Sequence, residues 1–128
     1  MRLKIKITKE VLEATKMCGT KGFMLEGSRN HFDSQNCAIT YACRKLFPNC
    51  YTRKYNIYIG KGNEEIIIAD LPQIAIDFIS VFDKATPVER VKMKPFEFEV
   101  ELIKEALDLI TIDEITKILE TSTTLEVV

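Results

Sequence analysis

Two stretches near opposite ends of the chain alternate apolar with charged residues, and their charges have opposite sign. Residues 2–7 alternate Leu and Ile with Arg and Lys, and residues 96–102 alternate Phe, Val and Leu with Glu. Alternation of this kind is typical of a half-buried β-strand. Opposite charges on neighbouring strands stabilise the pairing by about 0.2–1 kcal/mol per pair, and like charges destabilise it. We therefore predict that these two strands are antiparallel neighbours.

A central helix is predicted over residues 34–47. Ser34 is a suitable N-cap, and Pro48 disfavours helical geometry at the residue before it. The helical period places five residues on one apolar face, namely Ala38, Ile39, Ala42, Cys43 and Leu46. A shorter helix is predicted before it, from the Thr8 N-cap to a stop at Gly19. Residues 19–33, between the two helices, are predicted to form a loop.

The middle of the chain predicts a β-hairpin followed by an amphipathic helix. Residues 51–59 and 65–69 are its strands, joined by a glycine-containing turn. The second strand is apolar on both faces, as expected for the centre of a sheet. The helix, over residues 72–84, carries a broad apolar arc that is expected to face the core. The arc comprises Leu71, Ile74, Ala75, Phe78, Ile79, Val81 and Phe82.

The order β-α-β-β-α-β predicts an α+β fold of the ferredoxin-like or split βαβ type, with a four-stranded antiparallel sheet. Residues 88–94 form a basic connector, and two extra helices are expected over 102–110 and 112–119. We expect one domain over residues 1–120 and a flexible tail over 121–128.

The composition narrows the compartment and the cofactor classes. The N-terminus alternates instead of forming an apolar leader, and no apolar run is long enough to span a bilayer, so we expect a cytoplasmic protein without membrane contact. The four cysteines have no Cys-x-x-Cys spacing, and His31 is the only histidine. These features disfavour a zinc site, and free thiols are expected instead of disulfides. We expect no metal and no cofactor.

Charge is unevenly distributed along the chain. Residues 1–61 carry 12 Lys or Arg and 4 Asp or Glu, whereas residues 97–128 carry 2 and 9. Such asymmetry can mark a basic binding half, or two halves that neutralise each other in the fold. The predicted pairing of the basic and acidic strands favours the second interpretation. A Lys/Glu-compensated sheet face binds phosphates poorly, because nucleic-acid affinity comes from uncompensated cations.

One local cluster of basic and aromatic residues is the candidate binding patch. It combines the outer face of the central helix with the strand that follows, and an ordinary solvated surface is the alternative. The patch consists of Cys37, Tyr41, Arg44, Lys45, Tyr51, Arg53, Lys54 and Tyr55. Cys37 lies near the positive end of the helix dipole, which lowers thiol pKa values; the alternative is a small buried residue.

Catalytic signatures are weak. Paired carboxylates lie on an alternating strand that points them to solvent, and a His31/Cys37 pair has no evident third orienting group. We expect a protein that is not an enzyme, with thiol chemistry at Cys37 as the alternative.

Four segments resemble small uncharacterised proteins of phages, prophages and bacterial mobile elements. They are the opening Lys-Ile-Thr-Lys-Glu-Val-Leu, the central Asn-Cys-Ala-Ile from residue 36, the helix from Leu71-Pro72 to Phe82-Asp83, and Pro-Phe-Glu-Phe-Glu from residue 95. The resemblance covers roughly residues 3–102. Ala38 departs from it, since proline is common there, as do the longer 19–33 loop and the C-terminal helices. The resemblance implies a mobile-element setting and no particular activity.

Two functional hypotheses follow. The first is a small non-enzymatic binding or inhibitor module that acts on a host protein. The second is a nucleotide- or nucleic-acid-binding protein that uses the basic-aromatic patch. The sequence leaves open whether the chain forms a homo-oligomer.

Overall fold

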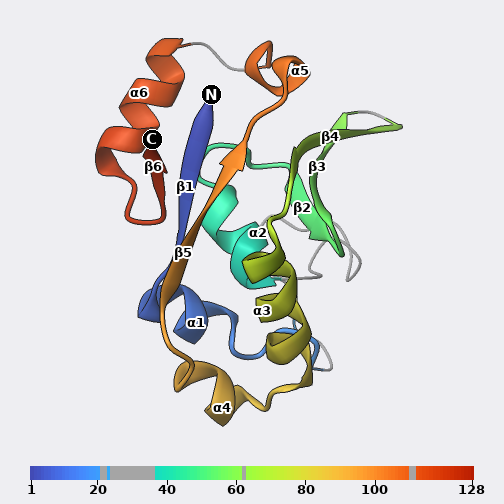
Figure 1. The fold of residues 1–128 in the computed structure, drawn as a ribbon, viewed down its shortest axis with the longest axis vertical. Coiled ribbons are helices and arrows are strands. Elements are labelled where there is room, and N and C mark those ends of the chain that lie inside the picture. The colour runs from blue at the N-terminus through green and yellow to red at the C-terminus, as the bar shows by residue number, and fades with distance from the viewer. Residues whose placement is uncertain (21–22, 24–36, 62, 110–111) are drawn as a thin grey trace.

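The computed structural model describes residues 1–20, 23, 37–61, 63–109 and 112–128, which form an α+β fold (Figure 1). The predicted N-cap at Ser34 and most of the predicted 19–33 loop lie outside these ranges. The elements in chain order are β1 (Arg2–Ile7), α1 (Lys9–Thr15), α2 (Cys37–Cys43), β2 (Cys50–Arg53), β3 (Asn56–Lys61), β4 (Glu64–Asp70), α3 (Gln73–Lys84), α4 (Pro87–Val91), β5 (Phe96–Glu101), α5 (Lys104–Leu107), α6 (Ile112–Thr121) and β6 (Leu125–Val127).

The first sheet confirms the predicted pairing of the oppositely charged strands. β1 runs antiparallel to β5, with Leu3 opposite Val100 and Ile5 opposite Phe98. The apolar residues of both strands are buried, except Phe96, which is partly buried, and the charged ones lie on the other face. Three ion pairs join the charged residues: Arg2–Glu99 at 3.6 Å, Lys4–Glu97 at 3.6 Å and Arg2–Glu101 at 3.7 Å. Exposed pairs of this kind contribute little stability each. Their main effect is therefore on which strand pairs with β1, not on how stable the pairing is.

The predicted four-stranded sheet is wrong, because β6 occupies the side of β1 where the second hairpin strand was expected. The first sheet has the order β5-β1-β6, and a separate three-stranded sheet has the order β2-β3-β4. β6 is part of the segment predicted as a flexible tail. Lys6 and Glu126 form an ion pair at 2.9 Å between β1 and β6, which lowers the pKa of the Glu126 carboxyl and raises that of the Lys6 ammonium.

The second sheet contains a turn that the alternating pattern of residues 51–59 did not predict. The predicted strand 51–59 is two strands, β2 and β3, joined at Lys54-Tyr55 with Arg53 opposite Asn56. A two-residue hairpin reverses the chain without a break in the alternation, and this one contains no glycine. The reversal puts Tyr51 and Ile57 on opposite faces of the sheet, whereas an unbroken strand would have put them on the same face.

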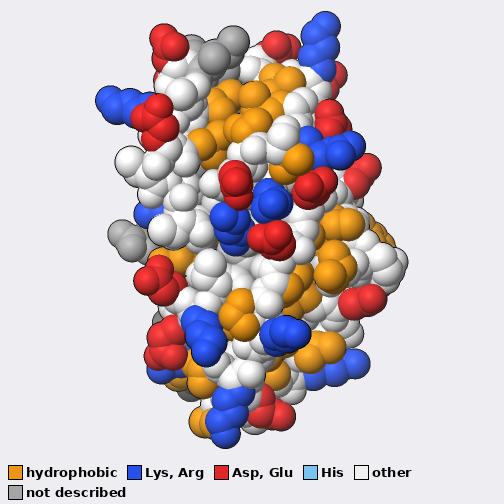
Figure 2. All heavy atoms as spheres, turned by 60° about the vertical axis from the view of Figure 1, so that its left-hand side comes forward, with side chains coloured by type: hydrophobic (Ala, Val, Ile, Leu, Met, Phe, Trp, Pro, Cys, Tyr) orange, Lys and Arg blue, Asp and Glu red, His pale blue; other side chains and the backbone are white. Residues whose placement is uncertain are grey.

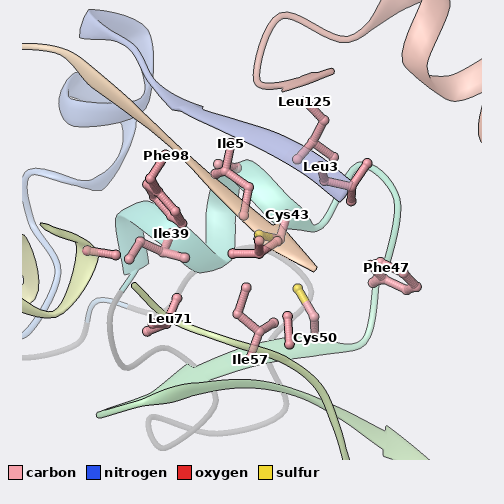
Figure 3. Close-up of a cluster of buried hydrophobic side chains, with 14 of the residues drawn as sticks. Leu3, Ile5, Ile39, Cys43, Phe47, Cys50, Ile57, Leu71, Phe98 and Leu125 are labelled. Atoms are coloured by element: carbon pink, nitrogen blue, oxygen red, sulfur yellow. The ribbon is translucent and has the colours of Figure 1, made fainter. Parts of the chain in front are cut away.

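The two sheets enclose one core, with α2 between them (Figure 3). Ile39 and Cys43 of α2 are buried against residues of both sheets. Polar groups on α2 are also paired: the Thr40 hydroxyl donates to the Thr52 hydroxyl on β2 at 3.0 Å, and the Thr124 hydroxyl donates to the Ala42 carbonyl at 2.9 Å. The segment that follows β5 also contacts the second sheet, since the Ile103 amide donates to the Ile68 carbonyl of β4 at 3.0 Å.

The buried side chain of Arg90 connects the helices α1, α3 and α4. Thr86 and Glu89 form a capping box that starts α4, which overlaps the basic connector predicted over residues 88–94. Arg90 of α4 is 5% exposed and donates to the carbonyls of Phe82 and Lys16, each at 2.9 Å, and to that of Cys18. Its guanidinium carbon lies 4.2 Å from the centre of the Phe82 ring. Arg90 therefore ties the C-terminal ends of α1 and α3 to α4.

Candidate functional site

The helical half of the candidate patch is only partly available to a ligand. Tyr41 is half-buried against the core, and the Arg44 Nε donates to the Cys50 carbonyl at 3.0 Å. Lys45 is exposed. The side chain of Cys37 lies outside the described part of the structure. Arg44 thus joins α2 to β2 instead of projecting from the helix as an independent cation.

The strand half of the patch is an aromatic stack with its own counter-ion. The Tyr51 and Tyr58 rings are stacked at 5.5 Å between centroids and 7° between planes. The Arg53 guanidinium lies 5.2 Å and 5.3 Å from these two ring centres. It also donates to both carboxylate oxygens of Glu65, at 3.0 Å and 2.6 Å. Tyr51 is only 4% exposed.

Lys54 and Tyr55 form a third, separate part of the patch, at the turn between β2 and β3. Both are exposed, and the Lys54 Nζ lies 5.1 Å from the centre of the Tyr55 ring. The predicted patch is therefore distributed over three local arrangements. The carboxylate of Glu65 compensates the charge of Arg53, which weakens the case for phosphate binding at that position.

The cysteines that the structure describes differ in whether the sulfur forms a disulfide. Cys18 is disulfide-bonded, so the expectation of free thiols is wrong for this residue. Cys43 and Cys50 are free and buried. Burial raises the pKa of both thiols, that of Cys50 to about 12, where nearby Arg44 acts in the opposite direction. Within the described residues, no group of three or more His, Cys, Asp or Glu is arranged to hold a metal ion.

We predict that Cys43 and Cys50 are alkylated at least about a hundredfold more slowly in the native protein at pH 8 than in denaturant, because only thiolate reacts and access requires opening of the core. Peptide mapping by mass spectrometry after timed alkylation would measure each site. Native modification of Cys50 at the denatured rate would contradict the buried placement.

A hollow that the sequence did not indicate lies between α6, β6 and Met1. It has a volume of about 420 Å³ and is lined mainly by apolar side chains, together with Glu120 and Glu126. The apolar lining comes from Met1, Ile115, Leu119 and Val127. Figure 2 shows apolar side chains gathered in the upper part of this side of the molecule, above a mixed band of acidic and basic side chains.

The exposed apolar residues of α3 were also unexpected. Ala75, Ile79 and Phe82 are buried as predicted, but Ile74 and Val81 are 53% and 58% exposed. The apolar arc of seven residues was wider than one buried face requires. That excess width was the available signal for a second apolar surface.

Comparisons with protein-family models, with curated proteins and with solved structures found no match. Among the described residues, no helix combines the length and apolar character needed to cross a membrane.

Proposed function

We propose that this chain is a small, non-enzymatic protein-binding module that captures an apolar, basic segment of a partner protein. The observation that carries the proposal is the apolar hollow between α6 and β6, whose lining also includes Glu120 and Glu126. Exposed apolar surface with a polar rim is characteristic of interaction sites. Val127, which lines the hollow, is 47% exposed and is therefore available for contact.

The charge of this region defines the chemistry of the partner. Residues 97–128 carry 9 acidic and 2 basic residues, and they supply every lining residue of the hollow except Met1. Complementary charge raises association rates and disfavours acidic partners. A bound segment would place an apolar side chain in the hollow and Lys or Arg beside Glu120, since Glu126 is already paired with Lys6 at 2.9 Å. The resemblance to phage and mobile-element proteins suggests a host protein as the source of that segment.

A peptide array provides the test. Peptides with an apolar centre flanked by Lys and Arg are expected to bind at least about tenfold more tightly than the same centres flanked by Asp and Glu. Val127→Arg should weaken binding at least about tenfold, because it adds a cation inside the hollow. Thr121→Arg adds the same charge on α6 outside the lining and should stay within about threefold of the unmodified protein. Equal binding by both variants would refute the proposed site.

Nucleotide or nucleic-acid binding is the second candidate. It is favoured by the partly exposed Tyr58 ring and the Arg53 guanidinium beside it, since aromatic rings and Arg planes can stack on bases. Binding to labelled single-stranded DNA would have to fall steeply with salt, as electrostatic contacts to phosphate do. The pairing of Arg53 with Glu65 makes this the weaker candidate.

A further inference from the structure

α3 presents an apolar stripe to solvent. Ile74 and Val81 are seven residues apart, about two helical turns, and both are more than half exposed. Phe78, half-buried, lies between them on nearly the same line. Ile74 and Val81 lie on the side of α3 away from the buried Ala75 and Ile79, whereas Phe78 also packs against Phe96 of β5. A stripe of this width is what a helix presents to a second helix.

A hollow lies beside the stripe. It measures about 430 Å³ and has two sides. Residues of α3 line one side, namely Ile74, Asp77, Phe78 and Val81, and residues 93–96 line the other, namely Met93, Lys94, Pro95 and Phe96. The Phe78 and Phe96 rings contact each other at 4.8 Å between centroids. One patch therefore combines protruding apolar side chains with an apolar recess. Such a patch can be complementary to itself when a two-fold axis relates two copies.

The charges on the solvent flank of α3 show the same self-complementarity. Asp77 and Lys84 are exposed, lie two turns apart on one flank of the stripe and have opposite sign. In an antiparallel pair of α3 helices with Phe78 of one copy against Val81 of the other, Asp77 of each copy lies across from Lys84 of its partner. In a parallel pair, whose two-fold axis runs along the helices, the Asp77 and Lys84 flanks of the two copies lie on opposite sides of the contact and form no such pairs.

We propose that this face is a homodimer interface in which α3 packs antiparallel against α3 of a second copy. Val81 of each copy enters the recess beside Phe96 of the other, and two Asp77–Lys84 ion pairs flank the contact. The surface is distinct from the α6/β6 hollow, so the dimer and the proposed partner binding are independent. An interface built on one 12-residue helix is small, which places the dimer among weak, concentration-dependent associations.

Sedimentation velocity between about 1 µM and 1 mM tests the dimer, because this range spans weak association. The unmodified chain should shift from 14.7 kDa towards twice that mass as the concentration rises. A single species of monomer mass at every concentration would overturn the proposal.

Charge exchange tests the geometry. Asp77→Lys alone and Lys84→Asp alone each create like charges at both contacts and should weaken the dimer at least about tenfold. The double variant should recover to within about threefold, and a mixture of the two single variants should form heterodimers. A double variant as weak as the single ones would overturn the antiparallel arrangement.

Substitution of the apolar stripe provides an independent check on the same face. Val81→Glu should abolish the dimer, whereas Val127→Glu, at the other apolar surface, should leave it intact. Circular dichroism melting curves would establish that each variant is folded. Loss of the dimer in Val127→Glu alone would move the interface to the α6/β6 hollow and overturn the assignment.

Discussion

Replacing Arg90 with alanine is expected to destabilise the protein by about 3–5 kcal/mol, because two buried carbonyls and one part-buried carbonyl would lose their charged donor. The carbonyls belong to Phe82 at the end of α3 and to Lys16 and Cys18 beyond α1. The substitution also removes the guanidinium from the Phe82 ring. Urea denaturation followed by circular dichroism would measure the change in the free energy of unfolding.

Two comparison variants separate the role of Arg90 from the general effects of removing a cation. Lys92→Ala removes an exposed charge at the end of the same helix and should change stability by less than about 0.5 kcal/mol. Arg90→Lys keeps the charge but not the planar arrangement of donors, so it should recover only part of the loss. Equal stability of Arg90→Ala and Lys92→Ala would show that Arg90 does not hold α1, α3 and α4 together.

Ile5→Ala is expected to cost about 2–5 kcal/mol, the usual range for removing a buried isoleucine side chain. Ile5 is 1% exposed and lies at the centre of the first sheet, opposite Phe98 on β5 and Leu125 on β6. The cavity would open where both strands and α2 meet (Figure 3). Chemical denaturation at several temperatures would quantify the loss.

The neighbouring residue on β1 supplies the control. Lys4 lies on the opposite face and forms an ion pair with Glu97 at 3.6 Å, so Lys4→Ala should cost no more than about 1 kcal/mol. The contrast between adjacent positions tests the alternation directly. Similar costs at Ile5 and Lys4 would mean that β1 does not bury one face as described.

The sequence predicted those parts of the fold that local pattern and charge determine. The β1–β5 pairing followed from alternation and opposite charge, and α3 followed from its helical period. The four-stranded sheet failed for two physical reasons. The Lys54-Tyr55 turn reverses the chain without any break in polarity, and β6 is a three-residue strand whose partner lies 120 positions away in sequence. Neither feature leaves a local signal.

The sequence also predicted the candidate site only in part, because several of its contacts join residues that are far apart in the chain. The sequence shows that Arg53 lies two residues from Tyr51. The pairing of Arg53 with Glu65, however, depends on β4 lying beside β3. The burial of Arg90 depends on carbonyls more than 70 positions earlier in the chain. The apolar hollows arise where separate elements meet, and therefore no single segment of the sequence contained them.

The arrangement of the first sheet has a consequence for how the chain folds during synthesis. β1 is synthesised before both of its partners, residues 96–101 and 125–127. Contacts so distant in sequence require the closure of long loops and slow folding. On the ribosome, the apolar face of β1 would remain exposed until β5 and β6 have been synthesised. We therefore expect this strand to be the segment of the nascent chain most dependent on chaperones.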